Sequence, residues 1–256
     1  MVSAVPHHAG MTRATGSTSG GTIDRWTRWW AIADPLLARF TRHPSPRGPV
    51  DDRPRRPRNA VVVQTDIVGS TRLLEAAGEA YPSVLLRHRA LISGAVERLG
   101  GRFLTHAGDG TLAVFDCAHD AIAASVEAQR ALAVERWPGG LALRVRTGVH
   151  AGQIYEVDGE PVGLTINQGA RIMAAAEPGQ VVVSSAAVTA ASPCAGGTAR
   201  AATVRYPVAD AGWHALRDHV GPVRLRQVVA DGLTVVLPAD HEIDLRDAVL
   251  PSVVLN

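Results

Sequence analysis

The stretch "QTDIVGSTRLLE" (residues 64–75) decides the organisation of the chain, because an apolar run ends there in an acid and a turn. The preceding residues 59–63 have the pattern of a buried central strand, and the following residues repeat apolar side chains at helical spacing. Asp66 is therefore expected at the rim of a sheet, where a helix begins. The turn residues Ile67, Val68, Gly69, Ser70 and Thr71 offer backbone N–H groups at a helix N-terminus, which is a common phosphate-binding arrangement.

Strand and helix patterns alternate from residue 59 onward. The order β-α-β-β-α-β-α-β predicts an α/β (α+β) fold, a ferredoxin-like split βαβ sandwich with a mixed, mostly antiparallel sheet and flanking helices. A segment at 213–229 is expected to add a helix or turn and a closing strand. The predicted elements are a strand at 59–67, a helical region at 71–99 interrupted near Gly78 and Pro82, a hairpin at 102–116, a helix at 118–136, a strand at 141–157, a helix at 164–176 and a strand at 180–184.

The chain is expected to divide into three parts: an extension at 1–58, a folded domain at 59–238 and a tail at 239–256. Within the extension, residues 1–21 have the composition of a disordered segment, and residues 43–58 form a Pro/Arg linker. Residues 22–42 carry three of the five tryptophans at helical spacing. This helix is expected to dock on its own domain or on a dimer partner, with a membrane-surface helix as the alternative.

Composition excludes several classes of protein. The 256 residues are 46% hydrophobic and carry a formal net charge of +2, which argues for neither a nucleic-acid partner nor membrane association. No uninterrupted apolar stretch is long enough for a transmembrane helix. The two cysteines, Cys117 and Cys194, give no disulfide framework, so we expect free thiols in a cytoplasmic protein.

A second acid, Asp109, lies at the predicted tip of the hairpin at 102–116. In a split βαβ sheet this hairpin lies beside the first strand, so Asp66 and Asp109 are expected within a few ångströms of each other. Two carboxylates at that separation repel unless cations bridge them. Oxygen ligands at an open rim suit Mg²⁺ or Mn²⁺, which also take phosphates as ligands.

Asn167 and Arg171 form the third element of the candidate site. They are four residues apart and therefore share one face of the predicted helix at 164–176. An amide and a guanidinium in this arrangement can orient a sugar and stabilise a phosphoryl transition state.

Together these motifs resemble the class III nucleotidyl cyclases, the adenylyl and guanylyl cyclase catalytic domains. The resemblance runs from about Asn59 to Ser185, and residues 213–233 carry a weaker match to the family's C-terminal strand. It is carried by "TDIVGSTRL", "GRFLTHAGDGTLAVF", "RVRTGVHAG" and "GLTINQGARIMAAAEPGQVVVS". The expected activity is conversion of ATP, or GTP, to the 3′,5′-cyclic nucleotide and pyrophosphate.

The resemblance implies a role for each matched position. Asp66 and Asp109 would hold two divalent ions, Mg²⁺ or Mn²⁺, with help from the Ile67 carbonyl. Asn167 would position the ribose and Arg171 would stabilise the α-phosphate. Arg146 matches a position that binds the triphosphate in some members. The family works as a head-to-tail dimer, so a homodimer is the expected partner arrangement, with the acids and the Asn/Arg pair of one site on different chains.

The base-reading positions depart from the family's usual pattern. Members that act on ATP usually carry a lysine and an aspartate where this chain has Thr105 and Glu160, whereas guanylyl members typically use Glu and Cys. The pair matches neither code, so we expect weak base selectivity with ATP somewhat favoured.

Two other functions remain open at this point. One is a degenerate cyclase fold that binds nucleotide or a partner with little turnover, as Thr105 and the Trp-rich segment suggest. The other is a nucleic-acid regulator that uses the Pro/Arg linker, although no basic stripe with interleaved aromatic residues is present. A diguanylate cyclase would carry a Gly-Gly-acid-acid-Phe hairpin, and "GDGT" at 108–111 differs from it.

Overall fold

A computed structural model describes residues 56–105, 108–157, 159–191, 205–217, 219 and 221–236. All of them fall within one compact unit, Pro49–Asn256. The predicted extension, apart from its last residues 56–58, and the predicted tail at 239–256 lie outside the described residues. The proposed domain boundaries therefore stay predictions.

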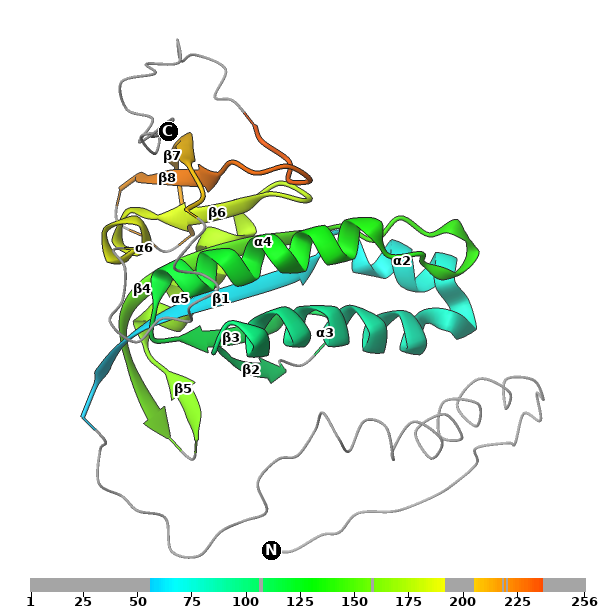
Figure 1. Ribbon diagram of the computed structural model, residues 1–256, viewed down its shortest axis with the longest axis horizontal. Coiled ribbons are helices and arrows are strands. Elements are labelled where there is room, and N and C mark those ends of the chain that lie inside the picture. Colours follow the sequence, from blue (N-terminus) through cyan, green and yellow to red (C-terminus); the bar gives the residue numbers. More distant parts are fainter. Residues whose placement is uncertain are drawn as a thin grey trace, which may run out of the picture. The chain divides into compact units, whose positions relative to one another are not determined.

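One mixed sheet, in the order β2-β3-β1-β4-β6-β8-β7, organises the described chain, and β5 pairs with β4 beside it (Figure 1). Only the β4–β6 pair is parallel among the pairs of this sheet. Strand β3 separates β1 from β2, which is the split βαβ arrangement. The strands are β1 (Arg58–Ile67), β2 (Arg102–Thr105), β3 (Thr111–Phe115), β4 (Val145–Val157), β5 (Glu160–Val162), β6 (Val181–Ser184), β7 (Val208–His214) and β8 (Val223–Val228).

Helices cover both faces of this sheet, as the predicted α+β sandwich requires. The helices are α2 (Ser70–Ala77), α3 (Tyr81–Arg98), α4 (Ala118–Val134), α5 (Leu164–Ala174) and α6 (Ser185–Ala190), with short 3₁₀ turns at Gly78–Ala80 and Pro138–Gly140. The predicted interruption near Gly78 and Pro82 is confirmed, because a 3₁₀ turn separates α2 from α3 there. The predicted fold class is confirmed as well.

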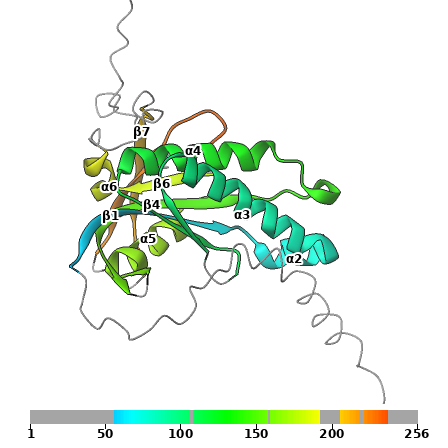
Figure 2. The same cartoon turned by 60° about the horizontal axis from the view of Figure 1, so that its bottom comes forward.

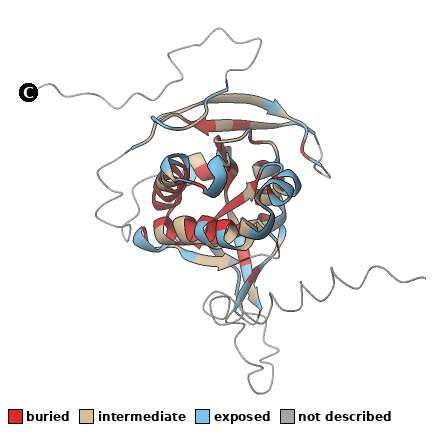
Figure 3. Cartoon of the chain, turned by 90° about the vertical axis from the view of Figure 1, so that its right-hand side faces the viewer, coloured by how far each residue is buried: buried red, intermediate tan, exposed pale blue. Residues whose placement is uncertain are grey.

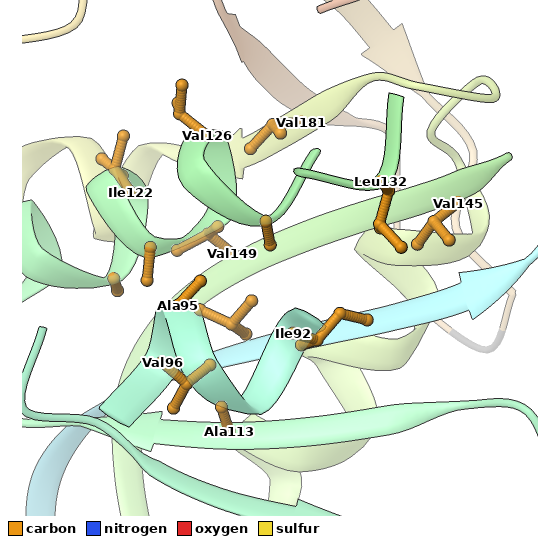
Figure 4. Packing of buried hydrophobic residues seen from close by; sticks show 14 of the residues in the cluster. Ile92, Ala95, Val96, Ala113, Ile122, Val126, Leu132, Val145, Val149 and Val181 are labelled. Atoms are coloured by element: carbon orange, nitrogen blue, oxygen red, sulfur yellow. The ribbon is translucent and has the colours of Figure 1, made fainter. Parts of the chain in front are cut away.

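The larger core lies between the sheet and helices α3 and α4. Figure 4 shows Ile92 and Val96 of α3 and Val126 of α4 with Val149 of β4 among the buried side chains of this layer. A smaller cluster on the opposite face joins β1 and β3 to α5 through Val62, Leu112 and Ile166, and Figure 2 shows α5 apart from α3 and α4. Buried residues line the sides of the helices that face the sheet (Figure 3).

Three glycines let α5 lie unusually close to the sheet. A methyl group at Gly152 would lie 2.6 Å from the Thr165 hydroxyl oxygen, and one at Gly169 would lie 2.9 Å from Val62 Cγ2. A methyl group at Gly148 would overlap the backbone of Met173. Because the backbone of Met173 cannot move aside as a side-chain end can, Gly148 limits the spacing between α5 and β4 most strictly, while Gly152 and Gly169 pack against side chains.

Two elements near the C-terminal end were not predicted. The segment at 213–229 contains the predicted turn, where the His219 N–H donates to the Leu216 carbonyl at 3.2 Å, and the predicted closing strand β8. Its first two residues end a further strand, β7, which was not predicted. Strand β7 has small and polar residues and a bulge between Asp210 and Gly212, which weaken an alternating pattern. Helix α6 follows β6 directly, and Ser184 caps it by accepting a hydrogen bond from the Ala187 N–H at 3.1 Å.

The expectation of two free thiols was wrong. Cys117, the residue before α4, is disulfide-bonded in the structure. Sequence separation alone gives no indication of whether two cysteines meet in a fold. The cysteines therefore no longer support a reducing compartment.

Candidate active site

The two predicted metal acids lie at the same end of the β1–β3 pair. Thr65 and Thr111 are the last paired residues of these strands, and their hydroxyl oxygens are 2.6 Å apart. Asp66 follows the first of them, and Gly110 precedes the second. A methyl group at Gly110 would lie 3.5 Å from the Thr65 carbonyl oxygen, so the turn that carries Asp109 continues along the end of β1.

Asp66 is paired with the arginine that the resemblance assigned to the triphosphate. Arg146 lies opposite Asp66 on strand β4. Its Nε and Nη2 donate to Asp66 Oδ2 at 3.0 and 2.6 Å, and its Nη1 donates to the Ala174 carbonyl at 3.4 Å. The ion pair is partly exposed, and it ties the end of β1 to the end of α5.

Asp109 has a different environment, formed mainly by α3. Its Oδ2 is buried and has no hydrogen-bond partner among the described residues. The charge of Asp109 reaches three residues of that helix, where it acts on the pKa values of Tyr81, His88 and Arg89. Burial and then Asp109 raise the pKa of Tyr81, whereas burial lowers the pKa of Arg89 against the opposing effects of Tyr81 and Asp109.

His88 is the most deeply buried member of this group. Its side chain is 0% exposed, and neither ring nitrogen has a hydrogen-bond partner among the described residues. Burial, followed by the positive charge of Arg89, lowers the pKa of His88 to about 4, although Asp109 opposes the shift. The imidazole is therefore neutral at pH 7.

The depressed pKa of His88 predicts a loss of stability in mild acid. The unfolded chain takes up a proton near pH 6.5 and the folded chain only near pH 4, so the free energy of unfolding falls as pH drops through this window. The difference corresponds to roughly 3 kcal/mol. Urea denaturation between pH 7 and 4 should show a flatter pH dependence for His88→Leu than for the native chain. Equal slopes in the two proteins would contradict this prediction.

The two carboxylates thus lie at the same end of the neighbouring strands β1 and β3, but they have different charged neighbours. Asp66 pairs with Arg146, whereas Asp109 lies near Arg89 of α3. Among the described residues, no three His, Cys, Asp or Glu side chains gather into a metal-binding group. The buried Oδ2 of Asp109, which none of the described residues donates to, nevertheless fits a cation, because a buried carboxylate oxygen without a donor is costly. Two acids and the carbonyl of Ile67 leave room for the water and phosphate ligands that Mg²⁺ prefers.

The turn after β1 keeps part of the predicted phosphate cradle. The Val68 N–H already donates to the Arg144 carbonyl at 2.9 Å. Gly69 has a left-handed backbone with φ of 69°, and none of the described side chains caps the helix that starts at Ser70. The prediction of phosphate contacts therefore rests on Gly69, Ser70 and Thr71.

The Asn167–Arg171 pair lies on α5, as predicted. Asn167 is exposed and Arg171 is half-buried one turn later. The neighbouring Gln168 is held by His150 of β4, whose Nε2 lies 3.0 Å from the Gln168 Oε1 and whose Nδ1 lies 2.9 Å from the Ser184 hydroxyl. Burial lowers the pKa of His150, against the hydrogen bond to Gln168. This network fixes the helix that carries Asn167 and Arg171.

The two predicted base-reading residues belong to strands β2 and β5, which do not pair with each other. Thr105 ends β2, and Glu160 begins β5 and is exposed. Arg102 connects the two regions, because its Nη1 donates to the Gly159 carbonyl at 2.6 Å and its Nη2 to Glu156 at 2.9 Å. The β2 edge and the β4–β5 hairpin therefore lie together, while the roles of Thr105 and Glu160 stay predictions.

The sequence reading missed the residues of α3 that surround Asp109. For His88 a signal was present, since it shares a spacing of four with the buried Val84, Ile92 and Val96. For Arg89 no comparable signal was available, because an arginine inside a helix is usually at the surface.

Comparison with known proteins finds similarity to cyclases. No protein-family model matches the sequence. A Rhizobium meliloti (strain 1021) protein named "Putative adenylate cyclase 3" is 33% identical over 132 residues, which are 50% of this chain and 22% of that protein. The chain spans less than half the length of the curated relatives it matches.

Solved structures give the same fold. The adenylate/guanylate cyclase/hydrolase from Silicibacter pomeroyi is 28% identical with a TM-score of 0.54, and the match covers 69% of this chain and 99% of that one. The adenylyl cyclase CyaB from P. aeruginosa has a TM-score of 0.58 at 21% identity, covering 68% and 95% of the two chains. The fold is thus that of the class III adenylate and guanylate cyclase domain, and the predicted resemblance is confirmed.

A membrane-spanning helix was not predicted from the sequence. In the part of the chain that the structure describes, every helix is too short or too polar to cross a bilayer.

Proposed function

We propose that this chain is a class III nucleotidyl cyclase that converts ATP, or GTP, to the 3′,5′-cyclic nucleotide and pyrophosphate. The observation that carries the proposal is the buried Oδ2 of Asp109, which has no hydrogen-bond partner within the described part of the chain and lies at the same end of the β1–β3 pair as Asp66. A cation gives that oxygen the partner it lacks, and the adjoining turn at Gly69 supplies N–H groups for phosphates.

Asp66, Asp109 and the Ile67 carbonyl are the proposed ligands of two divalent ions, Mg²⁺ or Mn²⁺. When bound, such ions lower the pKa of an attacking hydroxyl and neutralise charge on the triphosphate. Arg146 pairs with Asp66, and Asp66 would exchange this partner for a divalent ion if it served as a metal ligand. Arg146 is then available for a phosphate, which reconciles its observed partner with its predicted role.

Asn167 and Arg171 are proposed to act from the other half of the site. Asn167 is exposed and orients the ribose of the substrate. The ribose 3′-oxygen then lies in line with the bond from the α-phosphorus to the leaving pyrophosphate. Arg171 stabilises charge on the five-coordinate phosphorus. The close packing of α5 on the sheet at Gly148 and Gly169 supports this role, because transition-state stabilisation requires fixed groups.

A homodimer is the proposed active assembly, with nucleoside triphosphate as substrate. By analogy with the family, each site takes its acids from one protomer and its Asn/Arg pair from the partner. Two equivalent sites would then form about one twofold axis.

A second candidate is favoured by the ion pair between Asp66 and Arg146. An arginine that stays on Asp66 would block a cation, and the chain would then bind nucleotide or a partner with little turnover. The two candidates differ in product formation. The test is chromatographic detection of cyclic nucleotide from ATP and from GTP with Mn²⁺, at protein concentrations that favour dimers. Product supports the cyclase, whereas nucleotide binding without product supports the second candidate.

Weak discrimination between ATP and GTP is the prediction for the base pocket. Thr105 lacks the charged donor of the adenylyl code, and Glu160 keeps only an acceptor. One missing contact costs about 1–3 kcal/mol of discrimination. We therefore expect kcat/KM to favour ATP by less than about a hundredfold. A Thr105→Lys variant should widen the preference for ATP, and strong selectivity in the native chain would refute this interpretation.

A further inference from the structure

Arg89 is a buried cation directly beneath the turn that carries Asp109. It belongs to α3 and is only 7% exposed, although arginine is rarely buried without a partner. Its Nη2 donates a hydrogen bond to the Gly108 carbonyl, the residue before Asp109. The helix thus holds this turn by its backbone, across a sequence separation of 19 residues.

The hydrogen bond from Arg89 goes to the Gly108 backbone and not to the Asp109 carboxylate. The charge of Asp109 raises the pKa of Arg89, against the larger effect of burial, yet Asp109 Oδ2 and Arg89 Nε have no hydrogen-bond partners among the described residues. The other acid of the site shows the opposite arrangement, since Arg146 places two donors on Asp66 Oδ2. Arg146 therefore pairs directly with the Asp66 carboxylate, whereas Arg89 binds the backbone carbonyl of the residue before Asp109.

The turn needs such support. The register of β2 and β3 ends at Thr105 and Thr111, so no strand pairing extends over Gly108 and Asp109. Gly108 has a φ of 86°, a left-handed conformation that permits the turn but does not hold it in one orientation. A donor fixed in the core supplies that orientation.

We propose that Arg89 is a positioning residue for Asp109: by fixing the Gly108 carbonyl from inside the core, it aims the free carboxylate oxygen at a divalent cation. This inference rests on the proposed metal-binding role of Asp109. Arg89 itself touches neither cation nor substrate. Its removal should therefore weaken cation binding more than nucleotide binding.

The experiment measures Mn²⁺ binding to the full chain by isothermal titration calorimetry without nucleotide. Asp109→Asn first identifies the part of the binding that depends on this acid. Arg89→Met, which keeps an unbranched side chain without donors, should weaken that part about tenfold, or about 1.4 kcal/mol. Arg89→Lys should restore part of the loss, since it keeps a charged donor but not the planar fork.

Arg87→Met is the matched control on the same helix. Arg87 is exposed and pairs with Glu135 at 2.8 Å, away from the turn. The control should bind Mn²⁺ like the native chain. In kinetics, Arg89→Met should raise the Mn²⁺ concentration for half-maximal rate while the KM for ATP changes less than threefold.

Several outcomes would overturn the proposal. Native Mn²⁺ affinity in a folded Arg89→Met chain would do so, and where that variant does not fold, native affinity in Arg89→Lys would do so instead. Absence of Asp109-dependent Mn²⁺ binding in the native chain would also overturn it. A chain that binds Mn²⁺ through Asp109 and needs Arg89 for this, but forms no cyclic nucleotide, would refute the proposed function and leave this inference standing.

Discussion

Replacing Asp109 by alanine is expected to lower cyclic nucleotide formation by at least about a thousandfold, because the variant lacks one of the proposed cation ligands. Stability should hardly change, within about 1 kcal/mol. The lost Oδ2 is buried and accepts no hydrogen bond from any residue the structure describes, so its removal relieves a desolvation cost that offsets the lost attraction to Arg89. Large loss of activity with little loss of stability distinguishes a functional acid from a structural one.

Product formation with Mn²⁺ and urea denaturation measure the two quantities. Asp116→Ala is the matched control, since Asp116 ends the same hairpin, is almost fully exposed and pairs with Arg58. The control should keep native activity. An Asp109→Ala chain that retains activity within tenfold of the native chain would contradict the two-cation mechanism, and so would equal losses in both variants.

Mixing two inactive variants is expected to restore about a quarter of the native activity. Asp109→Ala damages the acid half of a site, and Arg171→Ala damages the half supplied by the partner. In an equal mixture about half of the dimers combine both chains, and each of these has one intact site of two. Each variant alone should show less than about a thousandth of native activity.

The control for this mixture is Asp109→Ala combined with Asp66→Ala. Both changes affect the same half, so no combination of these chains contains an intact site. Activity should be measured after the dimers have been diluted, mixed and reconcentrated to exchange subunits. Restoration in the first mixture alone supports a site shared between chains, whereas no restoration in either mixture would show that each chain works independently or not at all.

The sequence could predict those parts of the structure that depend on local patterns of apolar and turn residues. The valine run before Asp66, the hairpin around Asp109 and the helix with Asn167 and Arg171 each occur where periodicity placed them. The position of both acids at the same end of the β1–β3 pair could also be predicted, because a hairpin beside β1 can pair with it in only a few registers.

Contacts between elements that are distant in sequence could not be predicted from these local patterns. The Asp66–Arg146 pair depends on the register of β1 with β4, and the Arg89–Gly108 contact depends on how α3 lies beneath the hairpin. Strand β7 was missed because small residues and a bulge hide its alternation. The bonded state of Cys117 likewise depends on tertiary proximity.

The glycines beneath α5 have a consequence for how a two-chain site could close. Gly148 brings β4 against the backbone of α5 at Met173, and Gly169 brings α5 against the Val62 side chain of β1, so sliding or tilting α5 on the sheet would cause steric overlap. Asn167 and Arg171 therefore travel with the whole subunit as one rigid piece. In the proposed homodimer, tightening around a bound triphosphate would then be a rotation of one protomer against the other, and we expect cross-links between protomers to slow turnover.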